Sequence, residues 1–243
     1  MKHLPQLLTG DPVMLNDKIG IHQLTIKEII ETPELDQLLE PFTIDVETVD
    51  IGLRKRPQWT YDLFTMIDEK TGEPALGSNN TSYIAKLMIG FKVLCKVEDI
   101  EILDNGAMVL DNSFVVTKLN FDKIAEIVRE LYCREREVGE KPPESPRQYQ
   151  IWKETMEGRQ KKISREAPSI YDIINIVAHY GYNIRYKETL GLTLWQLFNS
   201  FEQLNTQDSY NEFRMYSSSS MVKIKEKDRM RHWTITSRLL KKK

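Results

Sequence analysis

The sequence contains little cysteine. Cys95 and Cys133 are the two cysteines among 243 residues, and neither stands in a CxxC motif or at a metal-binding distance from a histidine. A disulfide-stapled secreted domain, or a structural zinc site, needs several such residues at close spacing. Both cysteines fall in apolar, helix-like segments, so we predict buried, inert thiols in a reducing cytoplasm.

Long hydrophobic runs are also missing. No stretch approaches the roughly 18 apolar residues that a membrane span requires. The opening MKHLPQLLTGDPVML has neither a continuous apolar run nor a small-residue cleavage site, so we expect no secretory signal and no membrane partner. The chain is 40% hydrophobic and 29% charged, which is the composition of a globular protein with a buried core.

Sequence motifs that usually indicate a catalytic site are absent as well. The sequence has no GxxxxGK[ST], GxGxxG, HExxH or GxSxG pattern, and its carboxylate pairs lie in charge-rich surface segments. An enzyme is therefore disfavoured, although catalytic groups brought together from distant positions would leave no local motif. We predict no catalytic, cofactor-binding or metal-binding residues. The histidines are scattered, at His3, His22, His179 and His232.

Charge is unevenly distributed along the chain. From Lys223 to Lys243 there are nine Lys and Arg residues against Glu226 and Asp228, a balance of +7. Because the whole chain carries −2, the preceding 222 residues carry −9. A basic tail on an acidic body can bind nucleic acid or an acidic partner, fold back on its own body, or stay solvated. Basic and aromatic residues alternate only at Arg229–Trp233, so nucleic-acid binding has thin support.

The residues that are present predict an α+β fold that is mostly α-helical. Two short apolar segments flank Asn16–Lys18 and predict an N-terminal β-hairpin. A small three-stranded antiparallel insert is expected around residues 99–117, with a tight turn at Asn105–Gly106. Asn120 then caps an amphipathic helix over residues 121–132.

Several further helices are predicted in the first half of the chain. Thr25 and Glu28 form a capping box, so a helix begins at Thr25 and ends at Pro33, where the next one opens. Residues 45–69 are expected to be mostly helical, with a break near a proline. Residues 81–95 predict a mostly buried helix.

Composition divides the chain into four parts. We predict an N-terminal α+β domain over residues 1–133, a charged, proline-containing linker over 134–147, and a helical C-terminal domain over 148–222. The basic segment 223–243 completes the chain.

The C-terminal domain contains an unusual concentration of aromatic residues. The segment TLWQLFNSFEQL (193–204) predicts a helix that begins with a Thr193/Gln196 capping box, and a second short helix, DSYNEFRMYSSSS, follows it. The apolar stripe of the first helix is expected to pack against the helix over 169–181 or to face a partner, and both roles are compatible. If a binding surface exists, its candidates are Trp195, Phe198, Phe201, Tyr210, Phe213 and Tyr216.

The order of these segments resembles a known group of proteins. An N-terminal "PV…IGIHQLTIKEI", a β insert ending in "LNFDKIAEIVRELYC", a charged linker, "QYQIWKETMEGRQKKI", "IYDIINIVAHYGYNI…LTLWQLFNSFEQL" and a closing "RHWTITSRL" follow one another. This arrangement is similar to the tail assembly chaperones of long-tailed phages and prophages of Gram-positive bacteria.

The resemblance implies a non-catalytic protein of the host bacterial cytoplasm. Such chaperones bind the hydrophobic tape measure protein and keep it soluble until tail tube subunits polymerise around it. The expected partners are therefore the tape measure protein and possibly the tail tube protein, together with self-association. The main alternative is a structural virion component, such as a head–tail connector or baseplate part. A nucleic-acid-binding regulator is the less favoured alternative.

Overall fold

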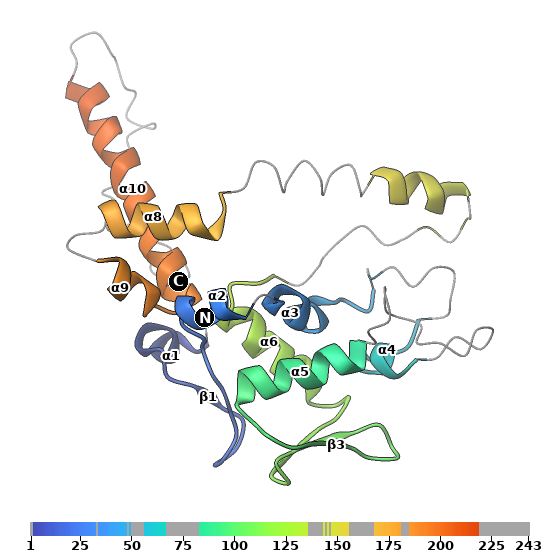
Figure 1. The fold of residues 1–243 in the computed structure, drawn as a ribbon. Helices are drawn as coiled ribbons and strands as arrows, with labels where there is room; N and C mark the ends of the chain where they lie inside the picture. Colours follow the sequence, from blue (N-terminus) through green and yellow to red (C-terminus); the bar gives the residue numbers. More distant parts are fainter. Residues whose placement is uncertain are drawn as a thin grey trace. The chain divides into compact units, whose positions relative to one another are not determined.

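The computed structural model divides the chain into two compact units, one formed by residues 3–167 and one that begins at Pro168 (Figure 1). The predicted fold class is confirmed: the protein is α+β and mostly helical, with an N-terminal antiparallel hairpin and a three-stranded antiparallel sheet. The predicted domain limits at 133, 147 and 222 stay predictions. The structure describes residues 2–32, 34–47, 49, 56–66, 83–135, 143, 145, 147–155, 168–180 and 185–218.

The N-terminal unit opens with a short helix and the predicted hairpin. Helix α1 (Leu4–Thr9), which the sequence did not lead us to expect, ends at Gly10 with a positive φ of 81°. Strands β1 (Val13–Met14) and β2 (Gly20–Ile21) pair antiparallel. The Asn16 side chain fixes their turn, because its Oδ1 accepts hydrogen bonds from the backbone of the turn at 2.9 and 2.6 Å.

Helix α2 (Ile26–Glu31) has the predicted capping box. The Thr25 hydroxyl accepts a hydrogen bond from Glu28 N, and the Glu28 carboxylate accepts one from Thr25 N at 2.7 Å. The Thr25 backbone N–H is also the main reason why the pKa of Glu28 is lowered. Helix α3 (Leu35–Thr43) follows, while Pro33 lies outside the described residues.

The predicted helix over residues 45–69 is wrong for most of the residues described there. Only α4 (Asp62–Thr65) is helical. Side chains take over the hydrogen bonds that a helix would make: Asp45 Oδ1 accepts from Glu47 N at 2.8 Å. The Arg56 guanidinium also donates to the carbonyls of Val46 and Val49, at 2.6 and 2.9 Å.

Helix α5 (Tyr83–Cys95) and the three-stranded sheet appear where the sequence predicted them. Strand β4 (Met108–Leu110) pairs with β3 (Ile100–Ile102) on one side and β5 (Phe114–Val116) on the other. Gly106, in the turn between β3 and β4, has a φ of 79°, a value that glycine adopts without strain.

Helix α6 (Phe121–Leu131) begins at the predicted position but is capped differently. Asn120 makes no side-chain bond to the helix. Its Oδ1 accepts from Thr117 N and its Nδ2 donates to Val115 O, both at 2.8 Å, so the residue ties the helix start to the preceding strand.

The core of the N-terminal unit is aromatic. Phe121 of α6 lies 6.0 Å from the ring of Phe42, 5.4 Å from Phe64 and 5.5 Å from Tyr61, and Phe42 meets Phe91 edge-on at 5.4 Å. Such pairs stabilise a core by about 0.5–1.5 kcal/mol beyond the area that they bury. The cluster thus joins α3, α4, α5 and α6, and Figure 1 shows the three-stranded sheet below α5.

Two polar links cross this core. The Lys86 ammonium of α5 is 2.7 Å from Glu40 of α3 and lies over the ring of Tyr83, 4.7 Å from its centre. The Tyr132 hydroxyl donates to His22 O at 2.8 Å and accepts from Leu24 N at 3.1 Å, and burial raises the pKa of that tyrosine. Both links fix the position of elements that are distant in the sequence.

The two cysteines differ. Cys95 is buried as predicted, and burial raises the pKa of its thiol to about 12. Cys133 is exposed, so the prediction of a buried thiol is wrong there. The chain turns at this residue, with a φ of 52°, directly after the buried Leu131 and Tyr132.

The C-terminal unit contains α8 (Ile170–Tyr180), α9 (Tyr186–Leu190) and α10 (Leu194–Ser218). Helix α9 was not predicted. The two helices expected after residue 193 are one continuous helix of 25 residues. Asn205–Thr206–Gln207 does not break it, since the Thr206 hydroxyl donates to Glu202 O one turn back at 2.7 Å. Residues 147–155, in the unit that precedes Pro168, are also helical.

Candidate partner-binding surface

The helices of the C-terminal unit begin at side chains that the sequence makes recognisable. Thr193 N donates to Gln196 Oε1 at 2.9 Å and Gln196 N donates to Thr193 Oγ1 at 3.3 Å, which confirms the predicted box at the start of α10. At the start of α8, the Ser169 hydroxyl and backbone N–H donate to Asp172 at 2.7 and 3.0 Å. These two bonds lower the pKa of the Asp172 carboxyl.

Helices α8 and α10 pack against each other, as the apolar stripe of 193–204 predicted. The core between them is small and aliphatic. Its most deeply buried members are Val177 of α8 and Leu197 of α10, both fully buried, with Ile173, Ile174 and Leu194 each at most 7% exposed. This core uses only the first turns of α10.

The second half of α10 has no buried residue. Every position from 205 to 218 is half-buried or exposed. Helix α8 has 11 residues and α10 has 25, which at 1.5 Å per residue gives lengths of about 16 and 38 Å. Helix α8 is therefore too short to cover all of α10.

The six predicted binding residues fall into three environments. Trp195 is only 7% exposed and belongs with the core, whereas Tyr216 is 63% exposed. The other four are half-buried. In chain order they are Phe198, Phe201, Tyr210 and Phe213.

These six side chains do not share one face of α10. Tyr216 follows Phe198 by 18 residues, which is five full turns, so both point in the same direction from the axis. Tyr210 follows Phe198 by 12 residues, and this places it about 120° away around the helix. The set that the sequence suggested as one surface thus extends over more than one side.

Exposed tyrosines form a second group, which the sequence reading missed. Tyr171 and Tyr180 of α8 are 63% and 74% exposed, and Tyr186 of α9 is 49% exposed. The Tyr186 hydroxyl donates to Asn175 and lies 3.1 Å from Nδ1 of His179. For Tyr171 the sequence holds a signal, because the buried isoleucines and valine of α8 mark an inner face that excludes it. Tyr180 falls near Ile173 by helical periodicity, and it is the last residue of the helix.

Among the described residues, no group of three or more His, Cys, Asp or Glu side chains could hold a metal ion. The buried ionisable groups act as structural links: the Tyr61 hydroxyl, whose pKa burial raises to about 12, donates to Gly106 O at 2.7 Å. What the C-terminal unit displays is aromatic surface, and such surface is suited to binding a protein.

The described helices of the C-terminal unit lie in a segment that is similar to a known family. Residues 159–237 match the family model of the YomV second domain, a phage-derived family of the Bacillus prophage type. The match includes α8, α9 and α10 but less than half of the chain. No curated protein and no solved structure matches the sequence. No helix in the described part of the chain is long and apolar enough to cross a membrane.

Proposed function

We propose that this phage-related protein is a non-catalytic tail assembly chaperone, which binds the tape measure protein in the host cytoplasm before the tail tube polymerises. One observation carries the proposal: the aromatic residues of α10 beyond Leu197 are not buried in the core of their own unit. They lie in the segment that matches a phage-derived domain.

Helix α10 is suited to keeping a tape measure protein soluble. A tape measure protein presents long amphipathic segments that aggregate when their apolar faces meet water. A partly exposed aromatic helix can bury such a face in the helix-in-groove manner, and aromatic residues contribute most of the energy of such interfaces.

Co-expression with the tape measure protein of the same phage genome tests the proposal. We expect the tape measure protein to become soluble and to co-elute with several copies of the chaperone in size-exclusion chromatography. Phe213→Ala should reduce the soluble fraction, because it removes a half-buried ring from α10. Lys187→Ala, which truncates an exposed, non-aromatic side chain of α9 in the same unit, is the control and should leave it unchanged.

Two results would overturn the proposal. A tape measure protein that stays insoluble in the presence of this protein contradicts chaperone activity. Recovery of this protein as a stoichiometric component of purified virions supports instead the structural alternative, a connector or baseplate part.

A further inference from the structure

Helix α5 of the N-terminal unit has an apolar face that remains partly exposed. One side packs tightly on α3: a Cβ added at Gly90 would lie 3.0 Å from the Leu38 carbonyl oxygen. On another side Ile89 remains 48% exposed and Met88 half-buried. Adjacent, partly exposed apolar side chains on a helix have the composition of an interface.

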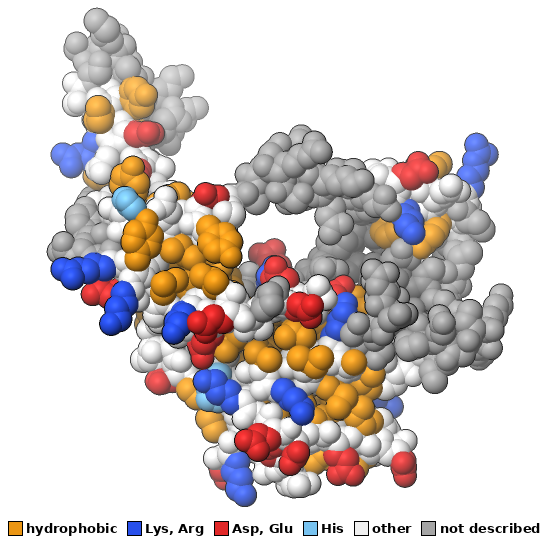
Figure 2. Space-filling view, in the orientation of Figure 1, with side chains coloured by type: hydrophobic (Ala, Val, Ile, Leu, Met, Phe, Trp, Pro, Cys, Tyr) orange, Lys and Arg blue, Asp and Glu red, His pale blue; other side chains and the backbone are white. Residues whose placement is uncertain are grey.

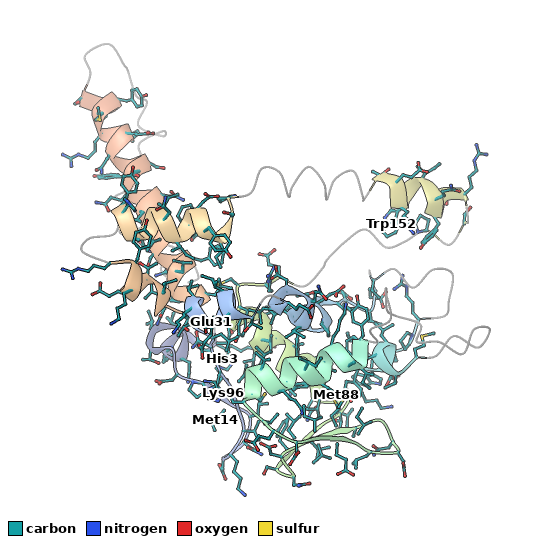
Figure 3. The ribbon with its side chains drawn as sticks, viewed as in Figure 1. His3, Met14, Glu31, Met88, Lys96 and Trp152 are labelled. Atoms are coloured by element: carbon teal, nitrogen blue, oxygen red, sulfur yellow. The ribbon has the colours of Figure 1, made fainter. Side chains whose placement is uncertain are left out.

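One lysine continues the same face, and a second lies just beyond the helix end, where the backbone has left the helical conformation with a φ of 54°. Lys92 lies one turn after Met88, and Lys96 follows directly after the end of α5; both are exposed. Lys96 reaches Glu28 only at 3.9 Å, with both side chains solvent-accessible, which is a weak pair. Figure 3 labels Met88 and Lys96 toward opposite ends of α5, and Figure 2 shows hydrophobic side chains interspersed with charged ones on this face of the unit.

The distal half of α10 carries the complementary pattern in reverse order. Asp208 and Glu212 are exposed and one turn apart, and Met215 and Tyr216 follow at 74% and 63% exposure. At 3.6 residues per turn these four side chains lie on one side of the helix. From N- to C-terminus, apolar residues are followed by two lysines in and after α5. In the distal half of α10, two carboxylates are followed by apolar residues.

We infer that α5 of one copy binds the distal half of α10 of a second copy as an antiparallel helix pair. Both segments are about 20 Å long, and antiparallel alignment brings every element of one pattern opposite its complement in the other. Parallel alignment would keep Lys92 opposite Glu212 but would place Lys96 against the apolar residues and Asp208 against Met88 and Ile89. The facing groups are Met88 and Ile89 with Met215 and Tyr216, Lys92 with Glu212, and Lys96 with Asp208.

The contact joins two different surfaces, so each copy offers one of each. Such a head-to-tail interface produces rings when the rotation between copies closes and filaments when it does not. The inference does not depend on tape measure binding, since the test above uses Phe213, which this contact does not use. Either proposal can fail while the other stands.

A charge swap in the full-length protein tests the pairing. In sedimentation velocity over a range of concentrations, we expect the wild type to form species larger than a monomer. Lys92→Glu and Glu212→Lys, each alone, place like charges opposite each other and should raise the concentration for half-association about tenfold. An equimolar mixture of the two variants restores opposite charges wherever unlike variants meet and should restore association between them.

Lys123→Glu, which reverses an exposed lysine on α6, is the matched control and should associate like the wild type. A wild type that is monomeric at all concentrations overturns the inference, and this includes the case in which the two segments meet within one chain. Failure of the mixture to restore association overturns it equally.

Discussion

In the N-terminal unit Phe42, Phe91 and Phe121 are each at most 1% exposed, whereas Tyr171 and Tyr216 in the C-terminal unit are both 63% exposed. The difference follows from the number of elements around each ring. Phe121 contacts aromatic residues from α3 and α4, while among the described elements α10 packs mainly on α8. A small unit has too little interior for its large side chains.

The aromatic content of a unit alone therefore does not reveal a binding surface. Both units are rich in aromatic residues, yet one uses them to hold four helices together and the other displays them. The distinction depends on how much of each helix another element covers. Three sets of substitutions and one labelling experiment test this distinction, in order of decreasing effect.

Removal of the central ring of the N-terminal core should have the largest effect. Phe121→Ala deletes a ring that meets three other aromatic rings, and we expect it to lower the free energy of unfolding by about 3–5 kcal/mol. Urea denaturation measures the loss. Leu119→Ala, at a residue that is 71% exposed, should change it by less than about 0.5 kcal/mol. Similar losses for both would show that the aromatic cluster is not the core.

Within α10, the two ends should respond differently to the same kind of truncation. Trp195→Ala removes a buried side chain and should destabilise the C-terminal unit by about 3 kcal/mol. Tyr216→Ala should change stability by less than about 0.5 kcal/mol. Hydrogen exchange of the α8 amides reports on this unit alone. Equal effects would mean that Tyr216 is part of the core.

The two threonine caps should contribute equally in the two units. Thr25→Ala and Thr193→Ala each remove the hydroxyl that accepts a backbone N–H at the start of a helix, and each should cost about 1 kcal/mol. Serine at either position keeps the hydroxyl and should recover most of the loss in thermal unfolding. A serine variant as unstable as the alanine variant would argue against the capping role.

Thiol chemistry should distinguish the two cysteines without changing the fold. In the native state at pH 8, iodoacetamide should modify Cys133, which is exposed, while Cys95 stays protected. Because burial raises the pKa of Cys95 to about 12, its thiol remains protonated in the fold. The resulting stabilisation is complete below the unfolded-state pKa and declines as pH rises above it. Mass spectrometry measures the labelling of each cysteine. Equal labelling of Cys95 and Cys133 in the native state would contradict the burial of Cys95.

Local signals in the sequence predicted much of the fold. The capping boxes at Thr25 and Thr193 and the turn at Asn16 were confirmed, because their hydrogen bonds join residues at most three positions apart. The three-stranded sheet was confirmed for the same reason, since its strands are joined by short turns. Such features depend on few residues outside their own segment.

Features that depend on distant contacts were not predictable. The segment from residue 45 looked helical by composition, but the Arg56 side chain binds the carbonyls of Val46 and Val49. The aromatic stripe of α10 predicted packing on α8, which was confirmed, but not where the packing ends. The position along α10 at which this packing ends depends on the length of α8 and not on any residue in α10. The binding roles of Trp195, Phe198 and the other four candidates stay predictions.

The continuity of α10 affects how easily its distal half forms. An isolated helix of about 14 residues is marginal in water, because its first turn must be nucleated at a large entropic cost. Here the half packed on α8 already supplies the nucleus, so the distal residues need only propagate the helix. Propagation adds one hydrogen bond for each residue that is fixed, with a free-energy change near zero. A partner that binds this half therefore meets a helix already started, and little of its binding energy is needed to order the remaining turns.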